Sequence, residues 1–451
     1  MSKREAQEAA KVALRGALQG GFEVSMEWGN LHRKGRWVEK TWIQRGFGTP
    51  LFTIISCFDK EDVAFMESPW ILVLCHEFPP LGGGAGKNLF LLCRELTRRG
   101  VKVEVWTGDP GARKRRPYDF QVDYFEVGRK ARFETSLKSM AAFILRVVLH
   151  ARSTRSRRPA LVFSVLGIPS GIAGSFVARF AGVPHVVWYH GSDIHGGKAQ
   201  GPGSFHRFLL RRIWQGAAMN FFVSTGLRDM ALSMGKPKRP TILSACPSPE
   251  ILAYPATGGE YPENRYFLFL GRFEAVKNPL LPLQAILKVK SRGKLTRKLR
   301  MVGSGDLGPE VQQFIRVNAL SGTVVLEGEA SFAKVPELLR SAYALILPSR
   351  MEGFNTTLLE AAHFGVPAIA SDTHGIRDFV RHNENGLLFR ENDAEALTEA
   401  MLVMAGDPVL RDSLGRKAKE AAAPFRPELV AETFLASVRD LIPAVAAAAG
   451  L

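Results

Sequence analysis

Two glutamates separated by seven residues, Glu352 and Glu360, stand in the stretch PSRMEGFNTTLLEAAHFGVPAIAS. The apolar run before them, Ser341–Ser349, predicts a buried strand. The residues after Glu352 predict a helix that Gly365 ends, capped at its start by Asn355, Thr356 or Thr357. Glu352 is therefore expected in the loop after a strand and Glu360 inside the next helix, whose first amides suit an anion such as a phosphate.

Paired carboxylates also serve glycoside hydrolases, where they converge on one bond from about 5–10 Å apart. Eight helical positions would set Glu352 and Glu360 ~12 Å apart along an axis. The pair therefore fits two contacts along an extended ligand better than it fits hydrolysis. Two surface glutamates on an ordinary strand–loop–helix unit are the plainer alternative.

Two cations follow another predicted strand of the same half. The run FLFLGRFEAVKNP ends its apolar part at Gly271 and then supplies Arg272 and Lys277. Further strands are predicted within Leu299–Gly308 and Thr323–Ala330, alternating with helices. That alternation predicts a parallel sheet whose loops gather at its carboxyl edge. Arg272 and Lys277 would then face the same crevice as Glu352 and could neutralise a diphosphate without a metal.

These segments together resemble the retaining nucleotide-sugar glycosyltransferases of family 4, which have the GT-B fold. The matching pieces keep the family order along the chain: ILVLCHEFPPLGGGAGKN, HGSD, FFVSTGLRDMALSMG, GRFEAVKN, VGSGDLG, the two-glutamate block and NENGLLF. Each piece alone is weak, but several in order make a strong signal. The resemblance runs from about Met66 to the carboxyl end. It implies an α/β chain of two Rossmann-like domains whose parallel sheets face a central cleft.

The resemblance also implies roles for individual residues. Arg272 and Lys277 would hold the donor diphosphate and stabilise the departing nucleotide, and Glu360 would bind the ribose. Glu352 would orient the transferred sugar, and His190 would line the sugar pocket from the other domain. Backbone and helix-start contacts to the donor are implied for the following residues: Gly83, Gly84, Gly303, Gly305, Gly353, Phe354, Asn355 and Thr356.

The implied reaction moves a sugar from a nucleotide-diphosphate donor to a hydroxyl of a glycan or lipid-linked glycan, with retention. The donor phosphate itself would take the proton from the acceptor hydroxyl. The sequence has no D-x-D motif, so we expect no metal and no cofactor beyond the donor substrate. One departure is the segment Ile242–Leu252, which lacks the family's Asn-Gly-Val-Asp-like turn and puts contacts from that turn in doubt.

Several other classes share parts of this pattern. GSGDLG after a strand fits a dinucleotide fingerprint, but a dehydrogenase does not explain Arg272, Lys277 or Glu352. GGGAGKN resembles a P-loop, yet Leu81 replaces its first glycine and Asn88 its Ser/Thr. His190, Asp193 and His195 fit no standard metal spacing. A non-catalytic sugar-nucleotide-binding protein and a sugar-nucleotide epimerase on the same fold remain open alternatives.

The length of 451 residues suits two α/β domains. We expect an extension over residues 1–65, poorly ordered or not native, with Met66 as the natural start. An amino-terminal acceptor domain over 66–256 and a donor domain over 257–425 follow, with a linker near Ala253–Arg265. Residues 426–451 are expected to form a helix that crosses back to the amino-terminal domain.

The charge of +17 is uneven: Arg98 to Arg158 carries 16 Lys/Arg against 6 Asp/Glu. This segment includes the apolar run Met140–Leu149, and beside that run stand Arg146, Arg152, Arg155, Arg157 and Arg158. A solvated face over a core helix is one interpretation, and docking on an anionic membrane surface is the other. No nucleic-acid recognition module accompanies the charge. With scattered cysteines and no spanning run, we expect a cytoplasmic protein, peripheral on the inner face of the membrane.

Overall fold

The computed structural model describes residues 69–111, 115, 117–128, 136–153, 158–195, 203–255, 265–294, 296–448 and 450, together with the backbone of three short strands before them. Those strands, β1 (Glu23–Glu27), β2 (Glu39–Gln44) and β3 (Phe52–Ser56), form an antiparallel sheet. The rest of residues 1–65, Met66, and most of the expected linker lie outside the described residues.

The first large domain is built on a seven-stranded sheet in the order β10-β9-β8-β7-β4-β5-β6, with every neighbouring pair parallel. Its central strands bury every side chain, as expected for a parallel sheet covered on both faces. The strands are β4 (Trp70–Cys75), β5 (Lys102–Gly108), β6 (Gln121–Phe125), β7 (Leu161–Val165), β8 (His185–Tyr189), β9 (Met219–Phe222) and β10 (Pro240–Ile242).

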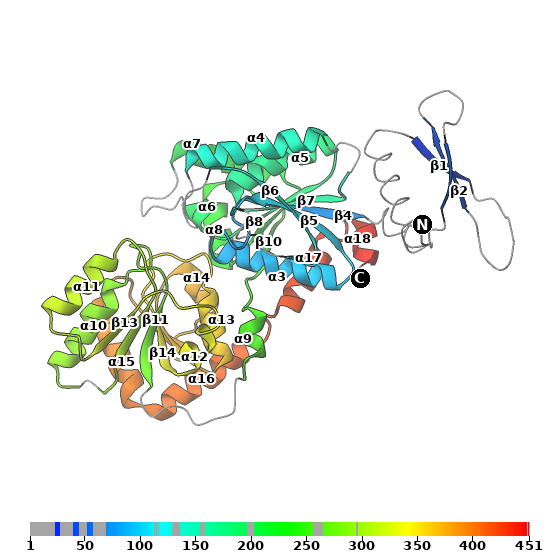
Figure 1. Ribbon diagram of the computed structural model, residues 1–451. Helices are drawn as coiled ribbons and strands as arrows, with labels where there is room; N and C mark the ends of the chain where they lie inside the picture. Colours follow the sequence, from blue (N-terminus) through cyan, green and yellow to red (C-terminus); the bar gives the residue numbers. More distant parts are fainter. Residues whose placement is uncertain are drawn as a thin grey trace.

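Helices cover both faces of this sheet (Figure 1). On one face α3 packs with α17, the helix returning from the end of the chain, and on the other lie α4 and α5. The helices of this domain are α3 (Gly84–Arg98), α4 (Leu137–Ser153), α5 (Ile172–Ala181), α6 (Ser192–His195), α7 (Ser204–Gly216), α8 (Thr225–Met234) and α9 (Pro249–Ala253).

The second domain has a six-stranded parallel sheet in the order β13-β12-β11-β14-β15-β16. Four strands fall where the apolar runs predicted them: β11 (Tyr266–Leu270), β12 (Leu299–Val302), β13 (Val324–Glu327) and β14 (Ala342–Leu347). The sheet is completed by β15 (Ala368–Ser371) and β16 (Gly386–Phe389), for which no strand was predicted. Its helices are α10 (Leu280–Ser291), α11 (Gly308–Val317), α12 (Val335–Arg340), α13 (Thr356–His363), α14 (His374–Arg377), α15 (Ala394–Gly406) and α16 (Pro408–Ala422).

The last helices join the two domains. α17 (Pro427–Val438) leaves the second domain and packs Phe434 against Phe163 of the first sheet, with ring centroids 4.8 Å apart; α18 (Pro443–Ala448) follows. Arg99, directly after α3, forms an ion pair with Glu432 on α17 (2.8 Å). Arg239 forms one with Asp440, just beyond α17 (2.7 Å). Figure 1 shows this segment rising from the lower domain to the upper one. None of the described helices is long and apolar enough to cross a membrane.

Candidate active site

The two domains meet at the carboxyl ends of their strands. A Cβ placed on Gly353 of the second domain would lie 2.0 Å from the carbonyl oxygen of His190 in the first. Nearby, Asp378 accepts hydrogen bonds from the Thr225 hydroxyl (2.7 Å) and the Gly226 amide (3.3 Å) at the start of α8. The loops after β8 and β14 therefore touch, and the functional side chains of both sheets gather around this contact.

Lys277 and Glu352 form the central ion pair of the second domain, with Nζ 2.6 Å from Oε1. The same carboxylate oxygen accepts a 2.9 Å hydrogen bond from Asn355, whose own Oδ1 caps α13 at the Thr357 amide. Burial acts to raise the pKa of Glu352, but Lys277 and Asn355 outweigh it and the pKa lies below its usual value. Glu352 is thus an ionised acceptor held in the loop, as its position after a strand predicted.

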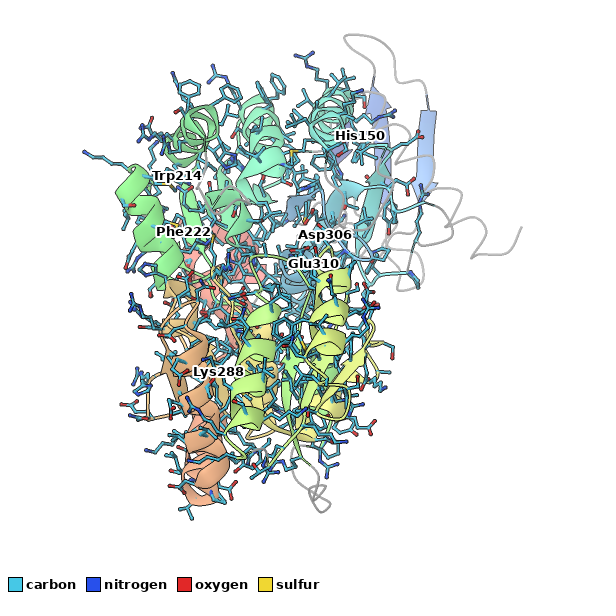
Figure 2. All side chains as sticks on the ribbon, turned by 90° about the vertical axis from the view of Figure 1, so that its left-hand side faces the viewer. His150, Trp214, Phe222, Lys288, Asp306 and Glu310 are labelled. Carbon is cyan, nitrogen blue, oxygen red and sulfur yellow. The ribbon has the colours of Figure 1, made fainter. Side chains whose placement is uncertain are left out.

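Arg272 stands after β11 and pairs with Glu274 rather than with Glu352. The turn that carries Arg272 is hydrogen-bonded to the glycine-rich turn after β12. The Phe273 amide donates to the Ser304 carbonyl (2.7 Å), and the Leu307 amide donates to the Phe273 carbonyl (2.8 Å). Gly303 (φ +146°) and Gly305 (φ +151°) are required here, because a Cβ on either would meet the backbone of Gly271 or Phe273. Figure 2 shows Asp306 and Glu310, which continue this turn into α11, at the end of the lower domain that is directed toward the upper one.

Glu360 lies on α13 with only 6% of its side chain exposed, and Lys87 of α3 reaches it from the other domain. The Lys87 Nζ lies 2.8 Å from Glu360 Oε1. Lys87 also lies over the ring of Phe332, 5.6 Å from its centroid. A carboxylate expected to bind ribose is therefore occupied by a lysine of the opposite domain.

His190 is half-buried beside Trp188 with its Nε2 covered, and the burial of the ring lowers its pKa to about 3, so the ring is neutral near pH 7. Asp193 accepts hydrogen bonds from the amides of Gly167 and Gly191, each 3.0 Å, which fixes the loop that carries His190. Burial also lowers the pKa of His195, opposed by the Glu352 charge nearby. Among the described residues no His/Cys/Asp/Glu group could hold a metal ion, in keeping with the structural role of Asp193.

Three buried polar atoms at the domain contact have no hydrogen-bond partner among the described residues: His190 Nε2, His195 Nε2 and Thr373 Oγ1. Buried polar atoms are ordinarily paired, so such a cluster marks a place where a polar ligand can supply the partners. Two of these atoms come from the first domain and one from the second. A sugar, with hydroxyls in several directions, has the right chemistry to satisfy them.

The glycine-rich loop before α3 divides into two kinds of position. Gly83 and Gly84, predicted to admit the donor, face open space, with nothing within 4 Å of an added Cβ. Gly82 (φ +68°) and Gly86 are the tight positions, because a Cβ on either would strike Glu77. The loop is thus held against Glu77 by the glycines that sequence reasoning passed over.

A separate cavity of about 570 Å³ lies at the amino end of the first sheet, lined by Trp70, Trp106, His150 and Phe180 among others. Figure 2 places His150 at the far end of the upper domain. None of the predicted site residues lines this cavity. The candidate active site is therefore the contact zone between the domains.

Sequence reasoning missed Lys87, Asp193, His195 and Glu274 as members or supports of this zone. His195 and Asp193 had been weighed only as metal ligands. Lys87 follows the glycine-rich loop, and its distance of 273 residues from Glu360 left no local signal. Phe354 was assigned through its backbone, and its ring also packs between apolar clusters of both domains.

Comparison with known proteins agrees with this geometry. Residues 83–245 match the glycosyl transferase 4-like domain, and residues 252–421 match the glycosyl transferases group 1 family. An uncharacterized glycosyltransferase of Methanocaldococcus jannaschii is 27% identical over 269 residues, which cover 59% of this chain and 71% of that protein.

A second relative and a solved structure extend the comparison. The Campylobacter jejuni α-1,4-N-acetyl-D-galactosaminyltransferase, named for a diphospho-undecaprenol-linked glycan, is 29% identical over 175 residues. That alignment covers 39% of this chain and 48% of the relative. The Anabaena protein HepE, solved with UDP-glucose, has a TM-score of 0.64 at 16% identity, covering 82% of this chain and 99% of that chain. This likeness shows the two-domain fold.

Proposed function

Because the chain belongs to the family 4 glycosyltransferases of the GT-B fold, an enzyme family that transfers sugars, we propose that it takes its sugar from a nucleotide-diphosphate donor and retains the anomeric configuration. The observation that carries this proposal is the Lys277–Glu352 pair beside Asn355, where the two domains touch. It sets a cation, an ionised acceptor and a helix start around one small space.

The charge of each site residue determines the part of the donor that it contacts. Lys277 and Arg272 carry the positive charge that a departing diphosphate needs, and such stabilisation is strongest in the transition state. Glu352 and the neutral ring of His190 face the sugar and fix its orientation through hydrogen bonds. Glu360 receives the ribose once Lys87 has released it. Positioning and charge stabilisation then account for catalysis without a protein nucleophile.

We propose that the reaction needs no divalent metal, supported by the lack of a D-x-D motif in the sequence. The acceptor is a hydroxyl of a glycan or lipid-linked glycan, and the enzyme works at the cytoplasmic face of the membrane. The diphospho-undecaprenol in the name of the Campylobacter relative and the basic first domain support a lipid-linked acceptor. Nucleic acid is not among the expected partners.

A thermal-shift screen against nucleotide sugars tests the donor part of the proposal, because a ligand at 100 times its dissociation constant stabilises by about 2.7 kcal/mol. The donor that shifts the melting temperature is then supplied with a glycan acceptor, and the product anomer is read by NMR with chelator present. A retained anomer is expected. An inverted product, loss of activity with chelator, or isomerised donor without transfer contradicts it, and no shift with any nucleotide sugar would contradict donor binding.

A further inference from the structure

Three helices form one outer layer of the first domain. α5 packs against α4 on one side and α7 on the other, and all three lie on the upper side of that domain (Figure 1). This layer holds half of the fourteen large apolar side chains that are exposed among the described residues. Exposed apolar residues are ordinary when scattered, but their concentration on one layer marks an interaction surface.

α4 is apolar on both of its sides. It buries Phe143 and Val147 against the sheet while Leu145 and Leu149 stay 60% and 52% exposed on the outside. Leu137, at its start, is 84% exposed. A helix between a core and water normally carries polar residues on its outer face. The outer face of α4 is therefore not that of a solvated helix.

The other two helices continue the pattern. On α5, Phe176 and Phe180 are 48% and 41% exposed, and on α7, Phe205 and Phe208 are 73% and 50% exposed. These are four of the five exposed phenylalanines in the described part of the chain. Aromatic rings of this kind seat well at the boundary between headgroups and acyl chains.

Cations surround these apolar side chains and acids are missing. The exposed cations are Lys138, Arg146 and Arg152 on α4, Arg179 on α5, and Arg207, Arg211 and Arg212 on α7. Between Thr135 and Arg228 the sequence has a single acidic residue, Asp193, which is buried in the active-site loop. An ordinary solvated face mixes both signs, whereas this one presents positive charge alone.

Two arginines lie against the exposed rings. The Arg152 guanidinium is 5.0 Å from the Phe180 ring centroid, and that of Arg212 is 5.2 Å from the Phe208 centroid. In both pairs the charged end of the arginine lies over the face of an exposed ring, which is the arrangement of a cation–π contact. Arg155 and Arg157, also expected here, lie outside the described residues.

The layer reaches the active site. Strands β6, β7 and β8 end at the cleft, and α4, α5 and α7 follow them in turn, so each helix starts on the cleft side of the sheet. Leu137 and Phe205 stand at these starts. A surface bound along the layer would therefore extend to the cleft where an acceptor must enter.

We propose that the outer layer of α4, α5 and α7 docks this enzyme on an anionic lipid bilayer, with the seven exposed apolar side chains entering the headgroup boundary and the surrounding cations contacting lipid phosphates. The inference rests on the proposed function in one respect: docking would bring the enzyme to a lipid-linked acceptor. A protein partner would be expected to offer the layer a matching acidic surface, and it becomes an outcome of the test.

The test is sedimentation of the full chain with vesicles of one part phosphatidylglycerol to two parts phosphatidylcholine, and with phosphatidylcholine alone, at about 50 and 500 mM salt. Binding to the anionic vesicles at low salt and its loss at high salt are expected. Arg146→Gln/Arg152→Gln should weaken binding about fivefold per charge removed. Leu145→Ser/Leu149→Ser and Phe205→Ser/Phe208→Ser should weaken binding to the anionic vesicles at low salt.

Matched controls come from the exposed side of the second domain. Val403→Ser/Val409→Ser and Arg416→Gln/Lys417→Gln alter equally exposed residues on α15 and α16 and should bind as the unaltered chain does. Absence of binding to anionic vesicles, equal binding to both vesicles, or unaltered binding by the α4 and α7 variants would overturn the proposal. The last result would leave the layer to a protein partner.

Donor binding is measured on the same preparations by thermal shift with UDP-glucose and the other nucleotide sugars. Donor binding should be unchanged in every variant, because none of the altered residues is among those assigned to the donor. If the unaltered chain binds the anionic vesicles but binds no nucleotide sugar, the result would contradict the proposed function and would still support the docking surface.

Discussion

Lys87 of the first domain donates a 2.8 Å hydrogen bond to Glu360 of the second, closing the two domains over the carboxylate that should receive the donor ribose. A charge-assisted bond to a carboxylate this buried is among the stronger contacts available to the cleft. A ribose hydroxyl that binds Glu360 Oε1 would have to share this oxygen with the lysine or displace it. Donor entry and the release of this contact are therefore coupled.

Replacing Lys87 with methionine should raise the affinity for the donor nucleotide about three- to tenfold. The substitution removes the competitor for Glu360, and a charged hydrogen bond contributes about 1.5–3 kcal/mol, of which part is regained by the ribose. Calorimetric titration with UDP and with the donor found by screening measures the change. Weaker binding would show instead that Lys87 moves to the donor phosphates.

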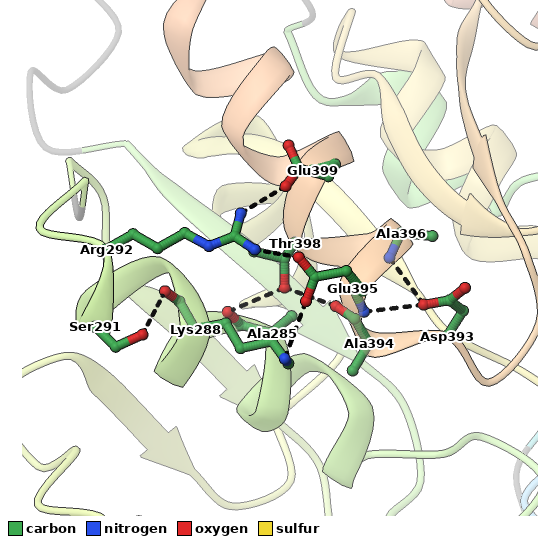
Figure 3. A network of polar contacts seen from close by, with 10 residues as sticks. All are labelled: Ala285, Lys288, Ser291, Arg292, Asp393, Ala394, Glu395, Ala396, Thr398 and Glu399. Atoms are coloured by element: carbon green, nitrogen blue, oxygen red, sulfur yellow. Dashed lines mark hydrogen bonds and ion pairs between the residues drawn. The ribbon is translucent and has the colours of Figure 1, made fainter.

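Removing either cation of the site should slow the chemical step. Arg272→Ala and Lys277→Ala are each expected to lower kcat about 100-fold or more, because the charge on the leaving diphosphate is largest in the transition state. The controls are Arg292→Ala and Lys288→Ala. These residues pair with Glu395 and Glu399 on the outer surface of α10 and α15 (Figure 3) and should leave the rate unchanged. Wild-type rates in the Arg272 and Lys277 variants would refute the assignment.

Glu360→Ala should act on binding rather than on turnover. It removes a charged acceptor for ribose, at a cost of about 1.5–3 kcal/mol in donor affinity, while Lys277 and Glu352 are left in place. KM for the donor should rise roughly 10- to 100-fold with a smaller change in kcat, measured by initial rates over a range of donor concentrations. A fall in kcat at unchanged KM would move Glu360 into the chemical step.

The sequence predicted most of the second domain because its signals are local. The AYALIL run of β14 is apolar throughout, Asn355 supplies the cap of α13, and Gly365 follows its end with φ +64°. Each of these depends on residues within a few positions of one another. The parallel order of the strands then followed from their alternation with helices.

Contacts between the domains were beyond reach of the same reasoning. Lys87 and Glu360 are brought together by the closed arrangement of two separate sheets. The hydrophobic pattern of the sequence carries no information on the distance between residues of different domains. Arg272 was placed correctly after β11, yet its partner Glu274 stands two residues away and was overlooked. Asp193 appeared as a possible ligand, whereas its two amide hydrogen bonds make it a support of the His190 loop.

Gly353→Ala should keep the domains apart. A methyl group at this position would lie 2.0 Å from the His190 carbonyl oxygen, a distance that no rearrangement of a side chain relieves, because the neighbour is backbone. Solution scattering should show a larger radius of gyration than for the unaltered chain, and kcat should fall while the melting temperature changes little. Gly322→Ala, where an added Cβ meets nothing, is the control, and equal scattering from both variants would contradict the expectation.

Stability should decline as the pH falls below about 6.5, the ordinary pKa of histidine. His185 is buried and His190 is half-buried, and burial of the rings lowers the pKa of each to about 3. Between these two pH values both histidines are protonated in the unfolded chain and neutral in the folded chain. The free energy of unfolding therefore falls as the pH falls, by up to about 1.4 kcal/mol per pH unit for each histidine, and levels off near pH 3. Asp193 acts in the opposite sense, because burial raises its pKa.

Urea unfolding at pH 7, 6 and 5 measures this dependence. The variant His190→Gln distinguishes the contribution of this histidine from that of the carboxylates. It removes one of the two groups that are protonated only in the unfolded chain, and it leaves Asp193 and Glu352 unchanged. Its stability should fall between pH 6 and pH 5 by about 1 kcal/mol less than that of the unaltered chain. An equal decline in both proteins would mean that His190 is protonated in the folded state, and its role as a neutral hydrogen-bonding ring in the sugar pocket would then be wrong.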